Sequence, residues 1–206
     1  MYIPEFNRIE DQAVAVDFMR ANPFAILVSN NDATPFATHL PVTVADDGGQ
    51  LLVRAHVAKS NPHWKMLEKQ ESLLIFHGPH AYISPALYEI HESVPTWNYA
   101  TVHAYGEGRL LPADTDKQQV LAELISQFDS SYLQHWNSFD EQYRSRMLNH
   151  IVAFEILVSR IEAKFKLSQN RTKREQENVI KALGTNPDSA VSGVAELMRK
   201  RGLGAK

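Results

Sequence analysis

The sequence predicts an α+β domain that is mostly β, with six or seven antiparallel strands in a small barrel and helices at its periphery. Three observations lead to this class. Apolar runs bounded by turn residues recur along the chain, as is typical of strands. The Asp46-Asp47-Gly48-Gly49 segment joins two of these runs, and its residues tolerate the positive φ of a hairpin loop. Helical segments interrupt the strands only at intervals, so the regular βαβ alternation of a parallel sheet is absent.

Local patterns predict the individual elements. Residues 10–21 are predicted to form a helix, because Val14 and Phe18 lie four apart and Asn22-Pro23 ends the pattern. Strands are predicted at seven places, which are residues 24–29, 36–45, 50–58, 73–77, 81–84, 98–111 and 151–166. Two further helices are predicted between the later strands, at residues 116–128 and 140–149.

The chain becomes helical and polar after residue 169 and is predicted to form a C-terminal helical hairpin. Thr172 and Glu175 have the spacing of a capping box, and Gly184 is placed to stop the first helix. A second helix is predicted to start at Asn186-Pro187 and to end near Gly202. We expect a barrel domain over residues 1–169 and the hairpin over 170–206, both in the same structural unit.

Composition limits the classes of function. With 206 residues, 44% of them hydrophobic, the chain can build one good core. The 21 basic and 24 acidic residues give a net charge of −3, so any contact with nucleic acid must rest on a local patch. The absence of cysteine excludes disulfides and thiol nucleophiles. No signal segment or long apolar run is visible, and we expect a cytoplasmic protein with no membrane contact.

The junction that runs from a strand into a helix at residues 54–64 predicts an anion site. Arg54 and His56 lie two apart on the strand and therefore share a face. Lys59, the Ser60 hydroxyl and the free N–H groups of a helix that starts at Ser60 or Asn61 can hold a phosphate from one side. The alternative is a capped helix beside a solvated lysine, which is a common arrangement.

Two other segments have the character of a ligand site. Residues 164–170 end a strand with basic and apolar side chains and then continue with Ser168, Gln169 and Asn170. Residues 95–99 place Trp97 and Tyr99 around an amide, an arrangement that offers a planar ligand a stacking surface and a hydrogen bond. The alternative for both aromatic residues is an ordinary place in the barrel. Together, the segments indicate one anionic ligand with polar edges.

Other candidate sites are weaker. Nine histidines, among them His77, His80 and His91, invite a metal or haem, but metal-binding spacings such as HExxH are missing and we expect no metal. Gly106 and Gly108 indicate a bulge or a close backbone approach within a strand. Six cations near the C-terminal helices can reach DNA phosphates, although the helix dipole favours cations near a helix C-terminus in any protein: Arg171, Lys173, Arg174, Arg199, Lys200 and Arg201.

Taken together, the sequence resembles the PaiB-type family of FMN-binding negative transcriptional regulators. The resemblance runs through nearly the whole chain and is carried by the following segments: 1–4, 39–41, 56–64, 78–85, 94–99, 102–103 and 166–170. It implies the split-barrel fold shared with pyridoxamine phosphate oxidases and flavin reductases, and a homodimer with FMN sites at the subunit interface. DNA as a partner rests on this resemblance only. One departure is Ala163, where the family is expected to favour glycine.

The resemblance also implies a set of cofactor-binding residues. His56, Lys59, Ser60 and Asn61, with Arg54 on the same strand, would surround the phosphate and the ribityl chain. Thr38, His39, Trp97 and Asn98 would face the isoalloxazine ring, and Gln169 and Asn170 would close the site from the same chain or from the partner subunit. We assign no catalytic residue. The alternatives are an FMN-dependent oxidoreductase or flavin reductase, and a split barrel that handles haem through a histidine.

Overall fold

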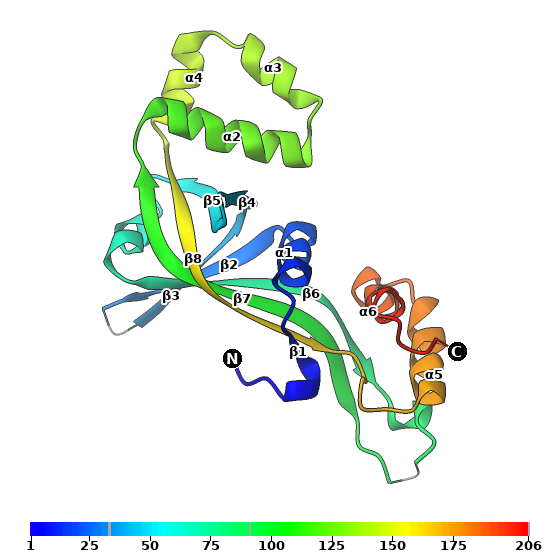
Figure 1. The fold of residues 1–206 in the computed structure, drawn as a ribbon. Helices are drawn as coiled ribbons and strands as arrows, with labels where there is room; N and C mark the ends of the chain where they lie inside the picture. The colour runs from blue at the N-terminus through cyan, green and yellow to red at the C-terminus, as the bar shows by residue number, and fades with distance from the viewer. Residues whose placement is uncertain (33, 91, 206) are drawn as a thin grey trace. The chain divides into compact units, whose positions relative to one another are not determined.

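The computed structural model describes residues 1–32, 34–90 and 92–205 and contains an eight-stranded sheet with helices around it (Figure 1). The strands are β1 (Arg8–Ile9), β2 (Phe24–Asn31), β3 (Thr34–Pro41), β4 (Thr43–Asp47), β5 (Gln50–Ala58), β6 (Glu71–Ile83), β7 (Thr96–Leu111) and β8 (Ile151–Lys166). The helices are α1 (Gln12–Ala21), α2 (Asp114–Phe128), α3 (Tyr132–Ser138), α4 (Glu141–Leu148), α5 (Lys173–Gly184) and α6 (Ser189–Lys200). Short 3-10 helices are η1 (Glu5–Asn7), η2 (Pro62–Lys65), η3 (Leu67–Lys69) and η4 (Pro85–Leu87).

The strand order is β3-β2-β6-β7-β8-β5-β4, with β1 paired to β8, so β3 and β4 are the two ends of an open path. Contacts divide the chain into two compact units. Unit 1 contains residues 1–15, 77–102 and 162–206, and unit 2 contains residues 16–76 and 103–161. The long strands β6, β7 and β8 contribute residues to both units.

Unit 2 is built on two antiparallel hairpins. Strands β2 and β3 pair from Phe24 with Pro41 to Asn31 with Thr34. Strands β4 and β5 pair across the predicted loop, in which Gly48 and Gly49 have φ of 61° and 94°. This confirms the hairpin that the sequence predicted. The alternation of buried and exposed side chains along β2 explains why one face of this sheet forms the core.

Helices α2, α3 and α4 follow one another in unit 2 (Figure 1). Helix α2 buries Val120 and Leu124 against Ala153 of β8. The sequence pattern did not predict α3, whose seven residues bury none of their side chains. A helix this short and exposed has little hydrophobic periodicity, so no pattern marks it.

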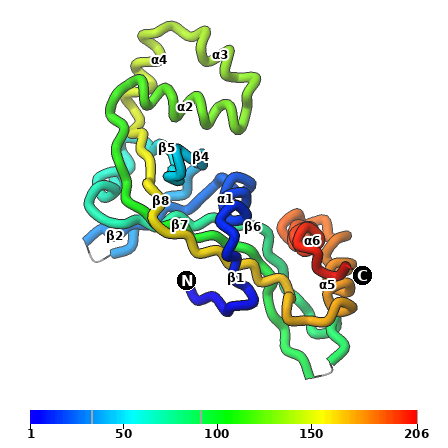
Figure 2. The backbone as a smooth tube through the Cα atoms, in the orientation of Figure 1, coloured from blue at the N-terminus to red at the C-terminus, as the bar shows by residue number. Residues whose placement is uncertain are grey.

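Unit 1 contains the predicted C-terminal hairpin. Figure 2 shows the α5 and α6 backbones side by side, in agreement with their mutual contacts. Val179, Val194 and Met198 are fully buried, so the apolar stripes of the two helices are covered within one chain. The capping box of Thr172 and Glu175 is present as predicted. None of the helices in the ranges given above is both long and apolar enough to cross a membrane.

The strand count corrects the predicted six or seven. The predicted strands 73–77 and 81–84 are one strand, β6, whereas 36–45 is divided at Val42 into β3 and β4. The short strand β1 was not predicted. Pro79 lies in the middle of β6, but the β2–β6 ladder spans only Leu73–Ile75, so its missing N–H removes no bond from that ladder.

Candidate functional site

The predicted site residues divide between the two units, and each group is described by itself. The first site group lies in unit 2 and comprises Thr38, His39, Arg54, His56, Lys59, Ser60 and Asn61. The second site group lies in unit 1 and comprises Trp97, Asn98, Gln169 and Asn170.

His56 of the first site group has a buried ring nitrogen, Nδ1, that forms no hydrogen bond with any described residue. Its strand β5 pairs with β8, which places His56 opposite Ala153. The Nδ1 atom is buried and has no hydrogen-bond partner within the described ranges. Burial lowers the pKa of His56 below its usual value, so the ring is neutral at pH 7. A buried polar atom without a partner costs free energy, and a ligand that bonds to it would remove that cost.

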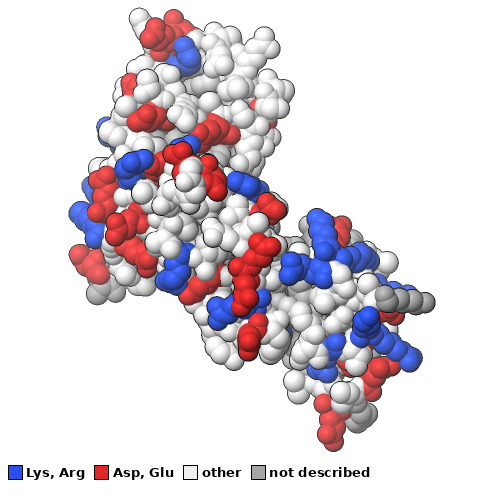
Figure 3. Space-filling model, in the orientation of Figure 1, with Lys and Arg blue, Asp and Glu red and all other residues white. Residues whose placement is uncertain are grey.

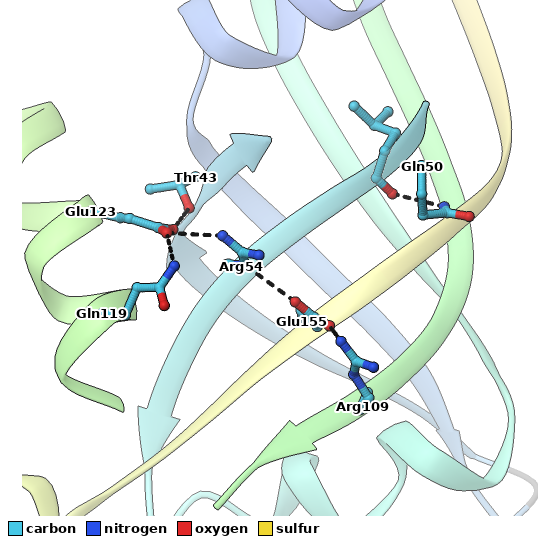
Figure 4. A network of polar contacts seen from close by, with 8 residues as sticks. Thr43, Gln50, Arg54, Arg109, Gln119, Glu123 and Glu155 are labelled. Carbon is cyan, nitrogen blue, oxygen red and sulfur yellow. Dashed lines mark hydrogen bonds and ion pairs between the residues drawn. The ribbon is translucent and has the colours of Figure 1, made fainter. Parts of the chain in front are cut away.

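Arg54, two residues before His56, takes part in a network of charges (Figure 4). Its Nη1 lies 2.9 Å from Glu123 Oε1, and its Nε lies 3.1 Å from Oε2 of the buried Glu155. Arg109 pairs with the other oxygen of Glu155. Burial opposes the charge of Arg54, but the two carboxylates outweigh it and hold its pKa above the usual value. The network lines a cavity of about 370 Å³ beside α2.

These ion pairs bear on the predicted phosphate contact of Arg54. An arginine that already holds two carboxylates has fewer donors free for a ligand. Its place at the phosphate therefore stays a prediction, and the structure favours a role in which Arg54 fixes β5 against β8 and α2.

Lys59 and Ser60 are exposed in the loop between β5 and η2. The Lys59 backbone is held at both polar atoms, because its N–H donates to His150 O at 2.8 Å and its carbonyl accepts from Trp64 Nε1 at 3.2 Å. The Lys59 amine forms no ion pair with any described residue. The side chain is thus free to reach an anion from a fixed backbone.

Asn61 caps the helix that follows, one of the two positions that the sequence proposed. Its Oδ1 accepts from His63 N at 3.0 Å, and its Nδ2 donates to Thr38 Oγ1 at 3.1 Å. Helix η2 has only four residues and is of the 3-10 type, so it offers fewer free N–H groups than the predicted helix start. The side chains are consequently the main polar groups of this loop.

His63 is a residue that the sequence analysis missed. It is fully buried and lies between two hydroxyls, with Nδ1 2.8 Å from Thr38 Oγ1 and Nε2 3.0 Å from Ser29 Oγ. Ser29 continues the chain to Ser72 at 2.7 Å. Burial lowers the pKa of His63 to about 4, which keeps the ring neutral. These bonds hold Thr38 and Asn61 in place, whereas His39 is exposed and has its ring centroid 6.4 Å from that of Phe24.

Asn98 anchors the second site group. It is buried, and its Nδ2 donates to Ser168 Oγ at 2.9 Å. Ser168 has a φ of 62°, so the chain turns sharply where β8 ends. Gln169 closes this turn locally, since its Oε1 accepts from Leu167 N at 2.7 Å and its Nε2 donates to Phe165 O. Asn170 is exposed, so its amide is available to a ligand.

Trp97 presents an exposed ring next to Asn98. Its side chain is 54% exposed, which is unusual for a tryptophan within a strand. The Tyr82 ring stands nearly perpendicular to it at a centroid distance of 6.1 Å, and His80 lies at 6.3 Å. A large exposed ring supported by other rings suits stacking on a planar ligand.

The structure brings Thr38 and Asn61 into direct contact, and it joins Asn98 to the turn that carries Gln169 and Asn170. Within the described ranges, no cluster of three or more histidine or acidic side chains has the geometry to hold a metal ion. His91, which the sequence analysis grouped with His77 and His80, lies outside those ranges.

Comparisons with known proteins bear on this arrangement. Two solved structures, the flavocytochrome Anf3 from Azotobacter vinelandii and the FAD and heme binding protein from Mycobacterium smegmatis, each align with a TM-score of 0.62. The first is 15% identical and covers 80% of this chain and 72% of its own length, and the second is 13% identical and covers 78% and 73%. These likenesses establish the fold, which is the predicted split barrel.

Sequence comparison identifies the family. The model of the family described as "Putative FMN-binding domain" matches residues 1–160. The protease synthase and sporulation protein PAI 2 of Bacillus subtilis (strain 168) is 35% identical over 208 residues, which cover 98% of each chain. The chain belongs to this FMN-binding, PaiB-type family, and its cofactor is FMN. The unpartnered His56 Nδ1 and the free Lys59 amine fit a ligand that carries a phosphate.

Proposed function

We propose that this chain is an FMN-dependent transcriptional regulator that acts on DNA as a homodimer, in which the first site group binds FMN together with the second site group of the partner subunit. The observation that carries the proposal is the unpartnered Nδ1 of His56, beside a loop whose Lys59 amine has no counter-ion among the described residues. In an FMN-binding family, these groups are the natural partners of the cofactor's anionic end.

Each residue then has a defined role. Lys59 and Ser60 hold the phosphate, and His56 bonds to it or to the adjacent ribityl hydroxyl. Asn61 bonds to the ribityl chain, and Thr38 lies with His39 toward the ring; His63 holds both Thr38 and Asn61 in place. In the second site group Trp97 stacks on the ring, while Asn98 positions the turn from which Gln169 and Asn170 contact the ring's polar edge. The bound flavin supplies a ring that can accept and return electrons.

Flavin titration tests the phosphate contact. Lys59→Ala removes a charge-assisted hydrogen bond and is expected to weaken FMN binding by about 1.5 to 3 kcal/mol, which is roughly 10- to 100-fold. Riboflavin lacks the phosphate, so its affinity should be unchanged. Saturation is followed by quenching of flavin fluorescence. Absence of saturable FMN binding by the unaltered chain at micromolar concentration would contradict the proposal.

The homodimer follows from the open path of the sheet. Strands β3 and β4 are the edge strands of that path. Proteins normally cover or protect the unpaired N–H and C=O groups of edge strands. Exposed apolar side chains such as Tyr82 and Trp97 add surface that a second copy can cover. Sedimentation should report a dimer at tens of micromolar, and a monomer there would contradict this part of the proposal.

DNA is the proposed regulatory partner, and the proposal includes a cytoplasmic location, where a bacterial-type regulator meets its operator. The relative from Bacillus subtilis, whose name describes it as a protease synthase and sporulation protein, supports this part of the proposal. An FMN-dependent oxidoreductase is the outcome to expect instead if NADH or NADPH bleaches the bound flavin and no DNA fragment binds.

A further inference from the structure

Two lysines at the end of β8 hold positive charge without an acidic partner. Lys164 and Lys166 lie two residues apart, so their side chains leave the same face of the strand. Lys164 is buried, donates to Tyr2 O at 3.1 Å, and lies 5.2 Å from the centre of the Tyr99 ring. Lys166 donates to Thr96 Oγ1 and, at 2.6 Å, to Trp97 O.

Neither lysine amine forms an ion pair with any carboxylate in the described ranges. Glu162, two positions before Lys164 on the strand, pairs with the N-terminal amine. Neutral oxygens and ring faces only partly offset the cost of removing an ammonium group from water. For Lys164, two ring faces supply part of the compensation.

Among the described residues no ring lies over the Lys166 amine, and the environment of this amine disfavours its charge. Burial, followed by the nearby charge of Lys164, lowers the pKa of the Lys166 amine below the usual value. An anion or a strong dipole that binds beside this amine would stabilise its charged form and raise its pKa again. A half-buried lysine bonded only to neutral acceptors is therefore a candidate ligand contact.

The location of Lys166 indicates which kind of ligand its amine contacts. Its amine bonds to the backbone of Trp97, whose exposed ring is the stacking surface of the second site group. The chain continues from Lys166 directly into the turn that carries Gln169 and Asn170. One strand end thus gathers a cation, an exposed ring and the exposed amide of Asn170, which together match a planar ring with a polar edge.

We propose that Lys166 is a further flavin-binding residue, whose ammonium group faces the electron-rich polar edge of the isoalloxazine ring. This inference rests on the proposed function. Reduction by two electrons and one proton leaves a negative charge on that edge, and a fixed cation beside it binds the reduced ring more tightly than the oxidised ring. Lys166 therefore contributes to affinity and favours the reduced form, whereas Lys59 contributes to the affinity for the phosphate.

Variants of Lys59 and Lys166, each titrated with FMN and with riboflavin, separate these two roles. Lys166→Met should weaken FMN and riboflavin by the same factor, about tenfold. Lys59→Ala should weaken FMN alone. Lys166→Arg keeps the charge and should retain most of the affinity. Lys173→Gln, on an exposed lysine of α5, is the matched control and should change neither ligand.

The reduction potential gives a second measurement, made by equilibrating the FMN-loaded chain with a reference dye and dithionite. A tenfold loss of preference for the reduced ring in Lys166→Met corresponds to about 30 mV toward more negative potential for a two-electron couple. Lys166→Arg should show little shift.

Three results would overturn the inference. These are unchanged affinity and potential in Lys166→Met, loss of FMN affinity without loss of riboflavin affinity, and an equal loss in Lys173→Gln. Circular dichroism and the melting temperature check that Lys166→Met folds, and Lys166→Gln repeats the test if it does not. If the unaltered chain binds no FMN, the proposed function itself fails.

Discussion

His63 shows how a single buried residue prepares a ligand site without touching the ligand. Its ring is neutral, so one nitrogen donates and the other accepts, and both find hydroxyl partners in Thr38 and Ser29. Thr38 in turn accepts from Asn61. The rotamers of two proposed cofactor contacts are therefore fixed before any cofactor binds, which lowers the entropy cost of binding.

The same residue predicts a pH dependence of stability. Folding lowers the pKa of His63 from 6.5 to about 4, so the unfolded chain binds more protons between these values. The contribution of the neutral His63 ring to the free energy of unfolding is therefore fully present above about pH 6.5. It falls by about 3 kcal/mol as the pH falls toward 4. Urea unfolding from pH 7.5 to 4 should show a steeper loss for the unaltered chain than for His63→Gln. Parallel curves for the two chains would contradict the assignment.

The site could be predicted from the sequence only in part, and for physical reasons. Lys59, Ser60 and Asn61 were visible because cap residues and Pro62 mark a helix start through local chemistry. His63 was not, because its partners lie on β2 and β3, more than 20 residues away. The carboxylate partners of Arg54 were likewise invisible, since Glu155 meets it only through the pairing of β5 with β8.

At the level of elements, glycines in β7 allow neighbouring backbone to approach closely. A Cβ on Gly106 would overlap the carbonyl oxygen of Leu157 on β8, and one on Gly108 would lie 2.5 Å from Leu67 Cβ. At these positions the sequence indicated a bulge or a close backbone approach, and the structure shows the close approach.

Gly106→Ala should therefore destabilise the fold, because the backbone of a paired strand cannot move aside as a flexible side chain can. We expect a loss of about 2 kcal/mol or more, measured by denaturant unfolding. Gly48→Asn is the control, since Gly48 lies in the β4–β5 loop with open space around it and Asn tolerates its positive φ. A Gly106→Ala chain as stable as the control would contradict the crowding.

The start of α5 permits a second prediction at this level. Thr172 Oγ1 accepts from Glu175 N at 3.3 Å, and Glu175 Oε2 accepts from Thr172 N at 3.1 Å. Thr172→Ala should cost about 1 kcal/mol of stability in thermal or urea unfolding, while Thr172→Ser keeps the hydroxyl and should cost less. Equal losses in both variants would show that the hydroxyl contributes nothing to the cap.

Strand ends were harder to predict than strands. The runs at 50–58 and 151–166 agree with β5 and β8 because continuous apolar patterns end at clear turn signals. The division of 36–45 reflects the pairing of β3 with β2 and of β4 with β5, and the continuous β6 lies between β2 and β7 in the sheet. The hydrophobic pattern of a single segment does not contain these pairings.

Charge is distributed unevenly over the whole molecule. Residues 1–169 contain 13 basic and 20 acidic residues, whereas residues 170–206 contain eight basic and four acidic ones. Figure 3 shows Lys and Arg side chains gathered over the α5–α6 hairpin. A chain with a negative net charge thus carries a local basic surface, which is the condition that its composition set for any nucleic-acid contact.

The proposed dimer makes a prediction about how the two site groups combine. Suppose that the second site group completes the FMN site of the partner subunit. Mixing a Lys59→Ala chain with an Asn98→Ala chain should then form heterodimers in which one of the two FMN sites carries both substitutions and the other carries neither. FMN affinity close to that of the unaltered chain should then return in part of the sites after mixing. A mixture that binds no better than either variant alone, although heterodimers form, would show that each chain builds its own site.

The DNA prediction depends on which basic residues are free. Arg171 lies over the Tyr88 ring at 3.8 Å, and Arg174 pairs with Glu89 at 3.0 Å, so these two are engaged within the chain. Lys173, Arg199, Lys200 and Arg201 are exposed and have no ion pair among the described residues. A dimer doubles this free charge, and binding to DNA should weaken steeply with salt, with a slope of about −0.9 per phosphate neutralised.

Arg199→Ala combined with Arg201→Ala should therefore flatten the salt slope by roughly 1 for each phosphate that the variant no longer neutralises, whereas Arg174→Ala should leave it nearly unchanged. Genomic fragments from the source organism are the test ligands, because random duplex reports only non-specific binding, and mobility shift across a salt series is the measurement. Equal effects of Arg174→Ala and of the double variant would place the DNA-binding surface elsewhere. If no fragment shows salt-dependent binding and NADH or NADPH reduces the bound flavin, the regulator proposal gives way to the oxidoreductase, because the flavin would then be redox-active and the basic hairpin would have no nucleic-acid partner.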